Sequence, residues 1–469
     1  MVDEMLDHLQ ELPNLPVWQP IPPETADRIL SEPVPWEGQG EGASYSGFIH
    51  DVLPYSNGNR HPRFFGWVQG NGIPLAMMAD MLASGMNPHM SGFQQAPVLV
   101  EQKLIAWLAE LMGFPPSTSG VLESGGTMGN ILGLAVARQA KAGFPVRSSG
   151  LQSEHAPLIV YCSTETHGWI EKGVELLGIG TKNCRKIRTH PDFTMDLEAL
   201  RGQIAADREA GLHPICVIGT AGTVNTGAVD DLEGIAEVCR ESSLWFHIDG
   251  AFGALARLTP ESAYKVQGLE LADSLAFDLH KWMYLPFEIA CVLIKDEQAH
   301  LATFAHAPSY LAALGRGPTA GGTVFADRGV DLTRGFKALK AWMCLKAYGV
   351  EAFSQAIQGN IVQAQRLAAL IDKSPVLDLA APVLLNVVCF RYVGGLTSAS
   401  EMDRVNTEVL LRIQERGIAM PSSTVLNGCF TMRACFVNHR TEDSDVRLLA
   451  ESAERIGREV EAEMGHSPG

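Results

Sequence analysis

One glycine-rich turn has the residues needed to bind a phosphate group. Within residues 119–130, a short apolar stretch leads through Gly125-Gly126-Thr127 into a helical pattern. Glycines let the backbone approach an anion closely, and the free N–H groups and the dipole of a helix start attract negative charge. A tight strand-to-helix turn that needs glycine only for its geometry is the simpler interpretation, and the turn taken alone favours it.

A carboxylate follows a second apolar stretch. In residues 245–251 the apolar side chains end at Asp249, and Gly250 and Ala251 come next. A carboxylate buried at such a position costs several kcal/mol unless it has a partner. A protonated ring nitrogen would be such a partner, since Gly250 and Ala251 leave room for a flat ring. An aspartate that caps the next helix explains the pattern equally well.

A lysine and a histidine complete the set of reactive residues. Lys281 lies in the apolar stretch 273–282, where a lysine is rarely left uncompensated. Schiff-base chemistry requires a desolvated lysine, whereas a lysine that reaches the surface is the ordinary alternative. His167 comes where another strand ends, and its ring could stack on a cofactor or move a proton. A lone histidine is more often a capping or core residue.

The elements that must position these residues alternate between strand and helix. Candidate strands are residues 120–122, 158–162, 214–219, 244–248, 274–277 and 290–294, and candidate helices are 127–141, 166–177, 197–210 and 232–241. This alternation predicts an α/β fold with a mostly parallel, doubly wound sheet, which binds ligands at the carboxyl ends of its strands. The turn, His167, Asp249 and Lys281 all fall at that edge.

The rest of the chain indicates three regions. Residues 1–72 form an N-terminal extension whose first 36 residues hold seven prolines around one helical stretch, 24–30, and it should lie along something else. Residues 73–335 form the large domain, with helices at 76–86 and 98–112 and an aperiodic loop at 306–331. Residues 336–469 begin with a long helix and suit a smaller α+β domain.

Composition narrows the function. The net charge of −17 disfavours nucleic acid and anionic membranes as partners, and no apolar run is long enough to span a bilayer. The acidic start lacks the pattern of a signal peptide, and nine scattered cysteines fit reduced thiols, so we expect a cytoplasmic protein. The 14 histidines form no zinc-ligand pattern, so no metal is predicted. P-loop, GxSxG and GxGxxG motifs are absent.

Taken together, the turn, His167, Asp249 and Lys281, in that order, resemble the pyridoxal phosphate (PLP)-dependent amino acid decarboxylases of the aromatic-amino-acid and glutamate decarboxylase group. The resemblance runs from His61 to Arg433, and Asp278-Leu279-His280-Lys281-Trp282 looks like that family's N-P-H-K-W block. It implies an enzyme of fold type I. The roles that it implies are a Schiff base to PLP at Lys281, a pyridinium partner in Asp249, a stacked ring in His167, a phosphate cradle in Gly125, Gly126 and Thr127, and His280 beside the lysine.

The resemblance also assigns a proton donor and shows departures. Tyr310 matches the loop tyrosine with which the family protonates the carbanion left when CO2 departs. Asp278 stands where the family usually has asparagine. Val224 replaces a threonine that commonly contacts the cofactor, so we expect Thr223 or Asn225 to take its place.

The substrate is the open question. The resemblance gives the pocket as Trp67, Gln69, His89 and Ser91, which could serve an aromatic or a polar side chain, with an aromatic L-amino acid weakly favoured. Decarboxylation to the amine is the leading hypothesis. The alternatives are an O2-dependent aldehyde synthase, which retention of His167 and Tyr310 disfavours, another PLP lyase or transaminase, and an inactive PLP-binding relative. The resemblance further implies a homodimer whose N-terminal segment packs on its partner.

Overall fold

The computed structural model describes residues 1–151, 155–306, 316–317 and 322–465, and its described residues divide into two compact units. One unit comprises Gly70–Val362 and Pro382–Val387. The other comprises Met1–Gln69, Gln363–Ala381 and Val388–Gly469. Tyr310 lies outside the described residues.

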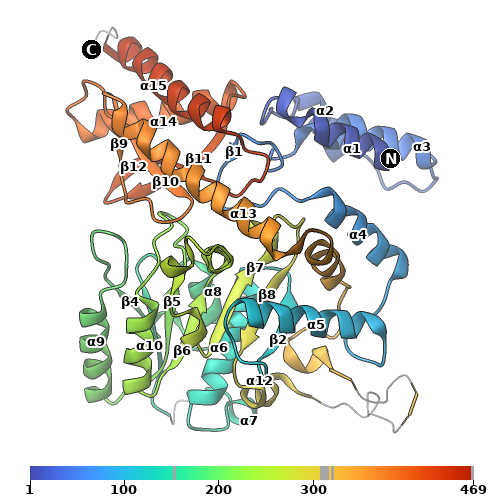
Figure 1. Ribbon diagram of the computed structural model, residues 1–469, viewed down its shortest axis with the longest axis vertical. Coiled ribbons are helices and arrows are strands. Elements are labelled where there is room, and N and C mark those ends of the chain that lie inside the picture. Colours follow the sequence, from blue (N-terminus) through green and yellow to red (C-terminus); the bar gives the residue numbers. More distant parts are fainter. Residues whose placement is uncertain (152–154, 307–315, 318–321, 466–469) are drawn as a thin grey trace. The chain divides into compact units, whose positions relative to one another are not determined.

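The larger unit is built on a seven-stranded sheet with the order β2-β8-β7-β6-β5-β3-β4 (Figure 1). Only β8 runs antiparallel to its neighbours among these strands, which confirms the mostly parallel α/β sheet. Most of these strands are buried on both faces, as parallel strands between helical layers require. The strands are β2 (Ser119–Glu123), β3 (Leu158–Ser163), β4 (Cys184–Ile187), β5 (His213–Thr220), β6 (Trp245–Asp249), β7 (Ser274–Asp278) and β8 (Ala290–Ile294).

Helices cover both faces of this sheet (Figure 1). Helices α6 and α8 pack together over one face, and α9 and α10 pack together on β5 on the other. Asp196 and Asp231 cap α9 and α10 by accepting backbone N–H bonds, which starts each helix at the predicted residue. The helices of this unit are α4 (Pro74–Met86), α5 (Ala96–Leu111), α6 (Gly126–Lys141), α7 (Val146–Ser149), α8 (Trp169–Leu176), α9 (Leu197–Glu209), α10 (Leu232–Glu241), α11 (Leu279–Trp282) and α12 (Glu297–Phe304), together with the part of α13 (Ala338–Lys373) that ends at Val362.

The second unit has a mixed sheet with the order β1-β11-β12-β10-β9. Helices α14 and α15 pack on each other, and α14 also packs on β11 and β12. The N-terminal residues are part of this unit, because β1 pairs in parallel with β11. Its elements are α1 (Val2–Glu11), α2 (Pro23–Ser31), α3 (Glu41–Gly47), β1 (Phe64–Phe65), β9 (Leu377–Leu379), β10 (Val387–Tyr392), α14 (Ala399–Glu415), β11 (Met420–Leu426), β12 (Cys429–Cys435) and α15 (Asp443–Gly465).

The prediction of a single helical stretch within the first 36 residues is wrong. Residues 24–30 do fall in α2, but α1 is a second helix that ends before the first proline of the chain at Pro13. Proline richness beyond residue 12 therefore says nothing about the residues before it.

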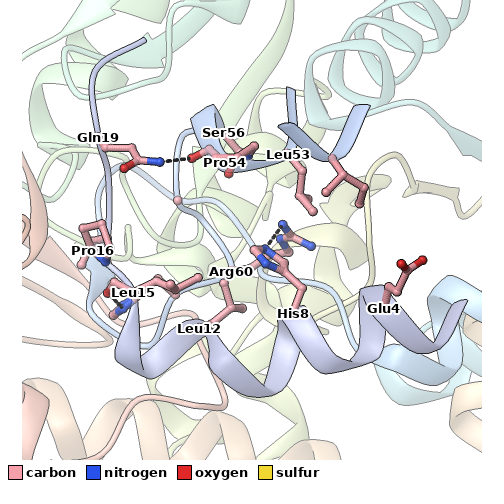
Figure 2. Close-up of a pocket in the computed structure, with 14 residues that line it drawn as sticks. Glu4, His8, Leu12, Leu15, Pro16, Gln19, Leu53, Pro54, Ser56 and Arg60 are labelled. Carbon is pink, nitrogen blue, oxygen red and sulfur yellow. Dashed lines mark hydrogen bonds between the residues drawn. The ribbon is translucent and has the colours of Figure 1, made fainter. Parts of the chain in front are cut away.

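A cavity of about 450 Å³ lies between α1 and the short helices at Phe48–Val52 and Leu53–Tyr55 (Figure 2). Leu12, Leu15 and Leu53 contribute apolar lining. Arg60 turns its guanidinium toward His8, and the Arg60 Nη2 and His8 Nε2 atoms are 3.3 Å apart. Burial, and then the Arg60 charge, lower the pKa of His8.

Candidate active site

Three segments that are distant in sequence meet at the carboxyl edge of the large sheet. A Cβ atom on Gly126 would lie 3.0 Å from Asp278 Oδ2 and 3.4 Å from the Ala251 Cβ, and one on Gly125 would lie 3.6 Å from His280 Cε1. The turn after β2, the residues after β6 and the residues after β7 therefore form one site. The first N–H groups of α6 have no acceptor within their helix, and they begin at this turn.

Lys281 is held by an ion pair with Asp278. Its Nζ atom lies 2.8 Å from Asp278 Oδ2, and its side chain is about one-fifth exposed at 22%. Gly70 packs against the backbone here, since a Cβ on it would lie 2.0 Å from the His280 carbonyl oxygen. No larger residue fits without moving the segment that carries the lysine.

His280 lies beside the lysine as a neutral imidazole. Burial lowers its pKa, and its Nδ1 atom is 2.9 Å from the Ile289 carbonyl oxygen. Its Nε2 atom is 3.6 Å from Asp278 Oδ2. The structure thus brings His280, Asp278 and Lys281 together, as the sequence predicts for neighbours in one block.

Asp249 is buried at the end of β6, and donors fix both of its oxygens. The Trp169 indole N–H donates to Oδ2 at 2.7 Å, and the Ala251 backbone N–H donates to Oδ1 at 3.1 Å. Asp249 does not cap a regular helix, so the capping alternative is not what the structure shows. Trp169, the first residue of α8, was missed by the sequence analysis, because no local pattern links an indole to a carboxylate 80 positions away.

A cluster of buried polar side chains is connected to Asp249 through Trp169. His247 Nε2 is 2.8 Å from Asn130 Oδ1, and its Nδ1 is 2.8 Å from Ser274 Oγ. Burial lowers the pKa of His247 to about 3, so the ring is neutral at ordinary pH. The Trp169 ring meets it edge-on with centroids 6.0 Å apart. The cluster ties α6, β6, β7 and α8 together around the carboxylate.

His167 is exposed and lies two residues before Trp169, between β3 and α8. Its Nδ1 atom accepts the Trp169 backbone N–H at 3.2 Å. That bond leaves the proton of a neutral ring on Nε2. Because Trp169 also contacts Asp249, the same residue orients the histidine and the carboxylate.

Thr223 has its hydroxyl engaged within its own turn. The Oγ1 atom is 2.9 Å from Thr226 Oγ1 and accepts the Ala228 N–H at 3.1 Å, and the residue is fully buried. Asn225 donates to Glu165 Oε2 at 3.0 Å. A cofactor contact by either residue stays a prediction.

The four predicted pocket residues fall in two different units. In one unit, the Arg433 guanidinium donates to the Trp67 carbonyl at 2.8 Å, and Asn57 donates to Gln69 Oε1 at 2.6 Å. In the other, the Ser91 backbone N–H donates to His89 Nδ1 at 3.3 Å. A pocket that combines the two pairs stays a prediction.

Glu123, the last residue of β2, is a buried carboxyl that the sequence analysis passed over. Burial raises its pKa to about 7. Arg334 is committed to Glu101, to which it donates through both terminal nitrogens, and it also donates to the Leu122 carbonyl at 2.9 Å. Glu123, two residues before Gly125, is therefore influenced by the charge of an arginine that is already paired with another carboxylate.

Comparison with known proteins identifies the family. A family model described as the pyridoxal-dependent decarboxylase conserved domain matches residues 47–393. The chain belongs to this family. It is 33% identical over 462 residues to the aromatic-L-amino-acid decarboxylase of Bacillus atrophaeus, covering 98% of this chain and 94% of that protein. It is 27% identical to the 4-hydroxyphenylacetaldehyde synthase of Rhodiola rosea, covering 97% and 94%.

Solved structures of the family have the same fold. The TDC of Oryza sativa with PLP and tryptamine superposes with a TM-score of 0.90 at 25% identity, covering 98% of this chain and 96% of that one. The Rhodiola rosea synthase gives a TM-score of 0.88 at 25% identity, with the same coverage. The chain is a PLP-dependent carboxy-lyase of fold type I, which decarboxylates an amino acid.

The residues at the sheet edge fit PLP. The cofactor needs an amine for its aldehyde, an anion site for its phosphate and an acid partner for its ring nitrogen. Lys281, the start of α6 and Asp249 offer these groups at one edge. The turn is a cradle that a Cβ on Gly126 would fill, and Asp278 Oδ1 is buried there without a hydrogen-bond partner.

Proposed function

We propose that this protein converts an aromatic L-amino acid to its amine and CO2 at the site of Lys281, Asp249 and the Gly125–Thr127 turn. The observation that carries the proposal is the meeting of these three groups at the carboxyl edge of one sheet. The aromatic choice is supported by the Bacillus atrophaeus relative, which is named for aromatic L-amino acids.

The residues of the chain have separate tasks in this reaction. Bound PLP supplies a conjugated ring that accepts the electron pair left on Cα when CO2 departs. Asp249 keeps the ring nitrogen protonated, and the Trp169 and Ala251 N–H groups hold its carboxylate in one orientation. The N–H groups at the start of α6 bind the phosphate.

Three more residues bind the cofactor or manage protons. Lys281 would hold the cofactor through its side-chain amine. His167 stacks on the ring and holds a proton on Nε2, while Trp169 fixes its other nitrogen. Tyr310 delivers the proton to Cα after CO2 has left, a role that rests on the family resemblance alone.

Release of CO2 from a panel of L-amino acids tests the substrate class. With purified, PLP-loaded protein, we expect CO2 release from Trp, Tyr, Phe or dihydroxyphenylalanine. We expect no CO2 release from Glu, Asp or cysteine sulfinate. Release from an acidic member alone would overturn the aromatic assignment while leaving the reaction class intact.

An aldehyde synthase is the second candidate, because one relative that spans the chain carries that name. In that reaction the amino acid, O2 and water would give an aldehyde, CO2, ammonia and hydrogen peroxide. Retention of both His167 and Tyr310 favours the amine. Peroxide formed in a 1:1 ratio with CO2 would favour the synthase instead.

We further propose a homodimer in which residues 1–72 pack on the partner, residues 73–335 form the large domain and residues 336–469 the small one. Exposed apolar side chains support an interface. Met81, Leu82 and Met86 on α4 are all more than half exposed, and Trp36 is 92% exposed. Met81→Glu should convert the dimer to monomers in analytical ultracentrifugation. Leu176→Glu, an exposed control on α8, should leave it dimeric.

A cytoplasmic location completes the proposal. All nine cysteines are free thiols, as a reducing compartment permits. In the described part of the chain, no helix is both long and apolar enough to cross a membrane.

A further inference from the structure

Asp278 occupies an unusual electrostatic position at the carboxyl edge of the sheet. It is 1% exposed, and its Oδ2 atom lies against the first residue of α6, where a Cβ on Gly126 would be 3.0 Å away. Its backbone N–H donates to the Ala251 carbonyl, which holds the residue in place. The carboxylate therefore lies beside the backbone N–H groups that receive the phosphate in the proposed site.

Few groups are available to balance this carboxylate. Among the described residues, those within ion-pair distance are Lys281 Nζ at 2.8 Å and His280 Nε2 at 3.6 Å, and His280 is neutral because burial lowers its pKa. The first turn of α6 and the Gly250-Ala251 segment, which pack against it, carry no charged side chain. Asp278 Oδ1 has no hydrogen-bond partner.

An arriving phosphate changes this balance in two ways. An ionised carboxylate and a phosphate dianion only accept hydrogen bonds, so they repel each other unless a proton lies between them. Lys281, the charged partner of Asp278 among the residues that the structure describes, is also the residue that would hold the cofactor. An asparagine at position 278 would instead offer two N–H donors to the phosphate and carry no charge.

We propose that Asp278 takes up one proton when the phosphate of PLP binds at the Gly125–Thr127 turn, so that cofactor capture weakens as pH rises. The inference rests on the site of the proposed function. It assigns to Asp278 a positioning role in the free protein, where it holds Lys281, and a proton-holding role in the loaded one.

Binding of pyridoxamine 5′-phosphate tests this without turnover, because this probe has the phosphate but no aldehyde for Lys281. Its dissociation constant is measured by calorimetry between pH 5.5 and 8.5 for the wild type and Asp278→Asn. The ratio of the wild-type to the variant dissociation constant should rise with pH and reach about tenfold or more at pH 8.5. A tenfold change corresponds to one pH unit. Ionisation of the phosphate itself cancels in this ratio.

Unphosphorylated pyridoxamine supplies the decisive control. Its ratio should stay flat with pH, since no phosphate meets the carboxylate. A flat ratio for the phosphorylated probe, or an equal rise for both probes, would overturn the proposal. Asp273→Asn is the control variant, because Asp273 is a partly buried carboxyl directly before the other end of β7, where its Oδ2 atom accepts the Phe246 N–H. It should behave like the wild type.

Two further variants keep the outcome unambiguous. If Asp278→Asn does not fold by circular dichroism, Asp278→Ser removes the same charge and should give the same rise. Gly126→Val fills the cradle and should abolish binding of the phosphorylated probe. Unchanged binding in Gly126→Val would show that the site itself is misassigned. Lost binding together with a flat Asp278→Asn ratio would reject only the proton uptake.

Discussion

Replacing Glu123 by glutamine should flatten part of the pH dependence of folding. Burial raises the pKa of this carboxyl from 4.5 to about 7, opposed in part by the Arg334 charge and reinforced by Asp331. Lys337 lowers it and Glu101 raises it to smaller extents. Between these two pH values the folded protein keeps a proton that the unfolded chain has lost. The stability that the protonated Glu123 contributes is therefore fully present below pH 4.5 and is lost as pH rises through 7.

The size of the effect follows from the shift. A difference of 2.5 pH units corresponds to about 3 kcal/mol, of which about 2–3 kcal/mol is lost between pH 5 and pH 8. Glutamine cannot ionise, so Glu123→Gln should lack this part of the pH dependence, whatever the substitution costs at a single pH. Because Glu123 is only 3% exposed, solvent does little to reduce the free-energy cost of ionising its carboxyl.

Urea unfolding of cofactor-free protein at pH 5 and pH 8 measures how the free energy of unfolding depends on pH. The free energy of unfolding of the wild type should fall by about 2–3 kcal/mol more than that of Glu123→Gln over this interval. Glu110→Gln, an exposed control on α5, should follow the wild type. If Glu123→Gln loses as much stability as the wild type, the carboxyl is not the buried, protonated group described here.

Two further predictions concern contacts found only in the structure. Trp169→Phe keeps an aromatic ring but removes the N–H bond to Asp249. PLP should therefore bind to this variant about tenfold or more weakly in equilibrium dialysis. Unchanged affinity would refute that role of the indole. Arg60→Gln removes the second cause that lowers the pKa of His8, so NMR titration should show that pKa higher than in the wild type, and a fall would contradict the geometry of the cavity.

The sequence predicted the strands that have continuous apolar runs. Residues 290–294 and 232–241 match β8 and α10 to the residue, because polar residues bound α10 on both sides and Lys295 follows β8. It missed β4, whose residues Cys-Arg-Lys-Ile form a half-exposed edge strand without an apolar pattern. It also placed the start of α8 at residue 166, although the helix begins at Trp169 after the turn that holds His167.

The reactive residues could be predicted because they fall at strand ends, where parallel strands bring them to one edge. The contacts that hold these residues in place could not be predicted. The Arg334–Glu101 pair joins residues 233 positions apart, and the Trp169–Asp249 bond joins residues 80 apart. No local pattern encodes such pairings, which arise only when helices pack on the sheet. Asp278 and Lys281 are only three residues apart, so the sequence indicated that they are neighbours, but their ion pair was found only in the structure.

The most direct test of the account locates the cofactor on the chain and follows the reaction at the same residue. PLP-loaded protein is reduced with borohydride, digested and analysed by mass spectrometry, and CO2 release from an aromatic L-amino acid is measured for the wild type and Lys281→Ala. We predict that the pyridoxyl group is found on Lys281 and that Lys281→Ala releases no CO2. A pyridoxyl group on another lysine, or appreciable CO2 release by Lys281→Ala, would contradict the assignment of this site.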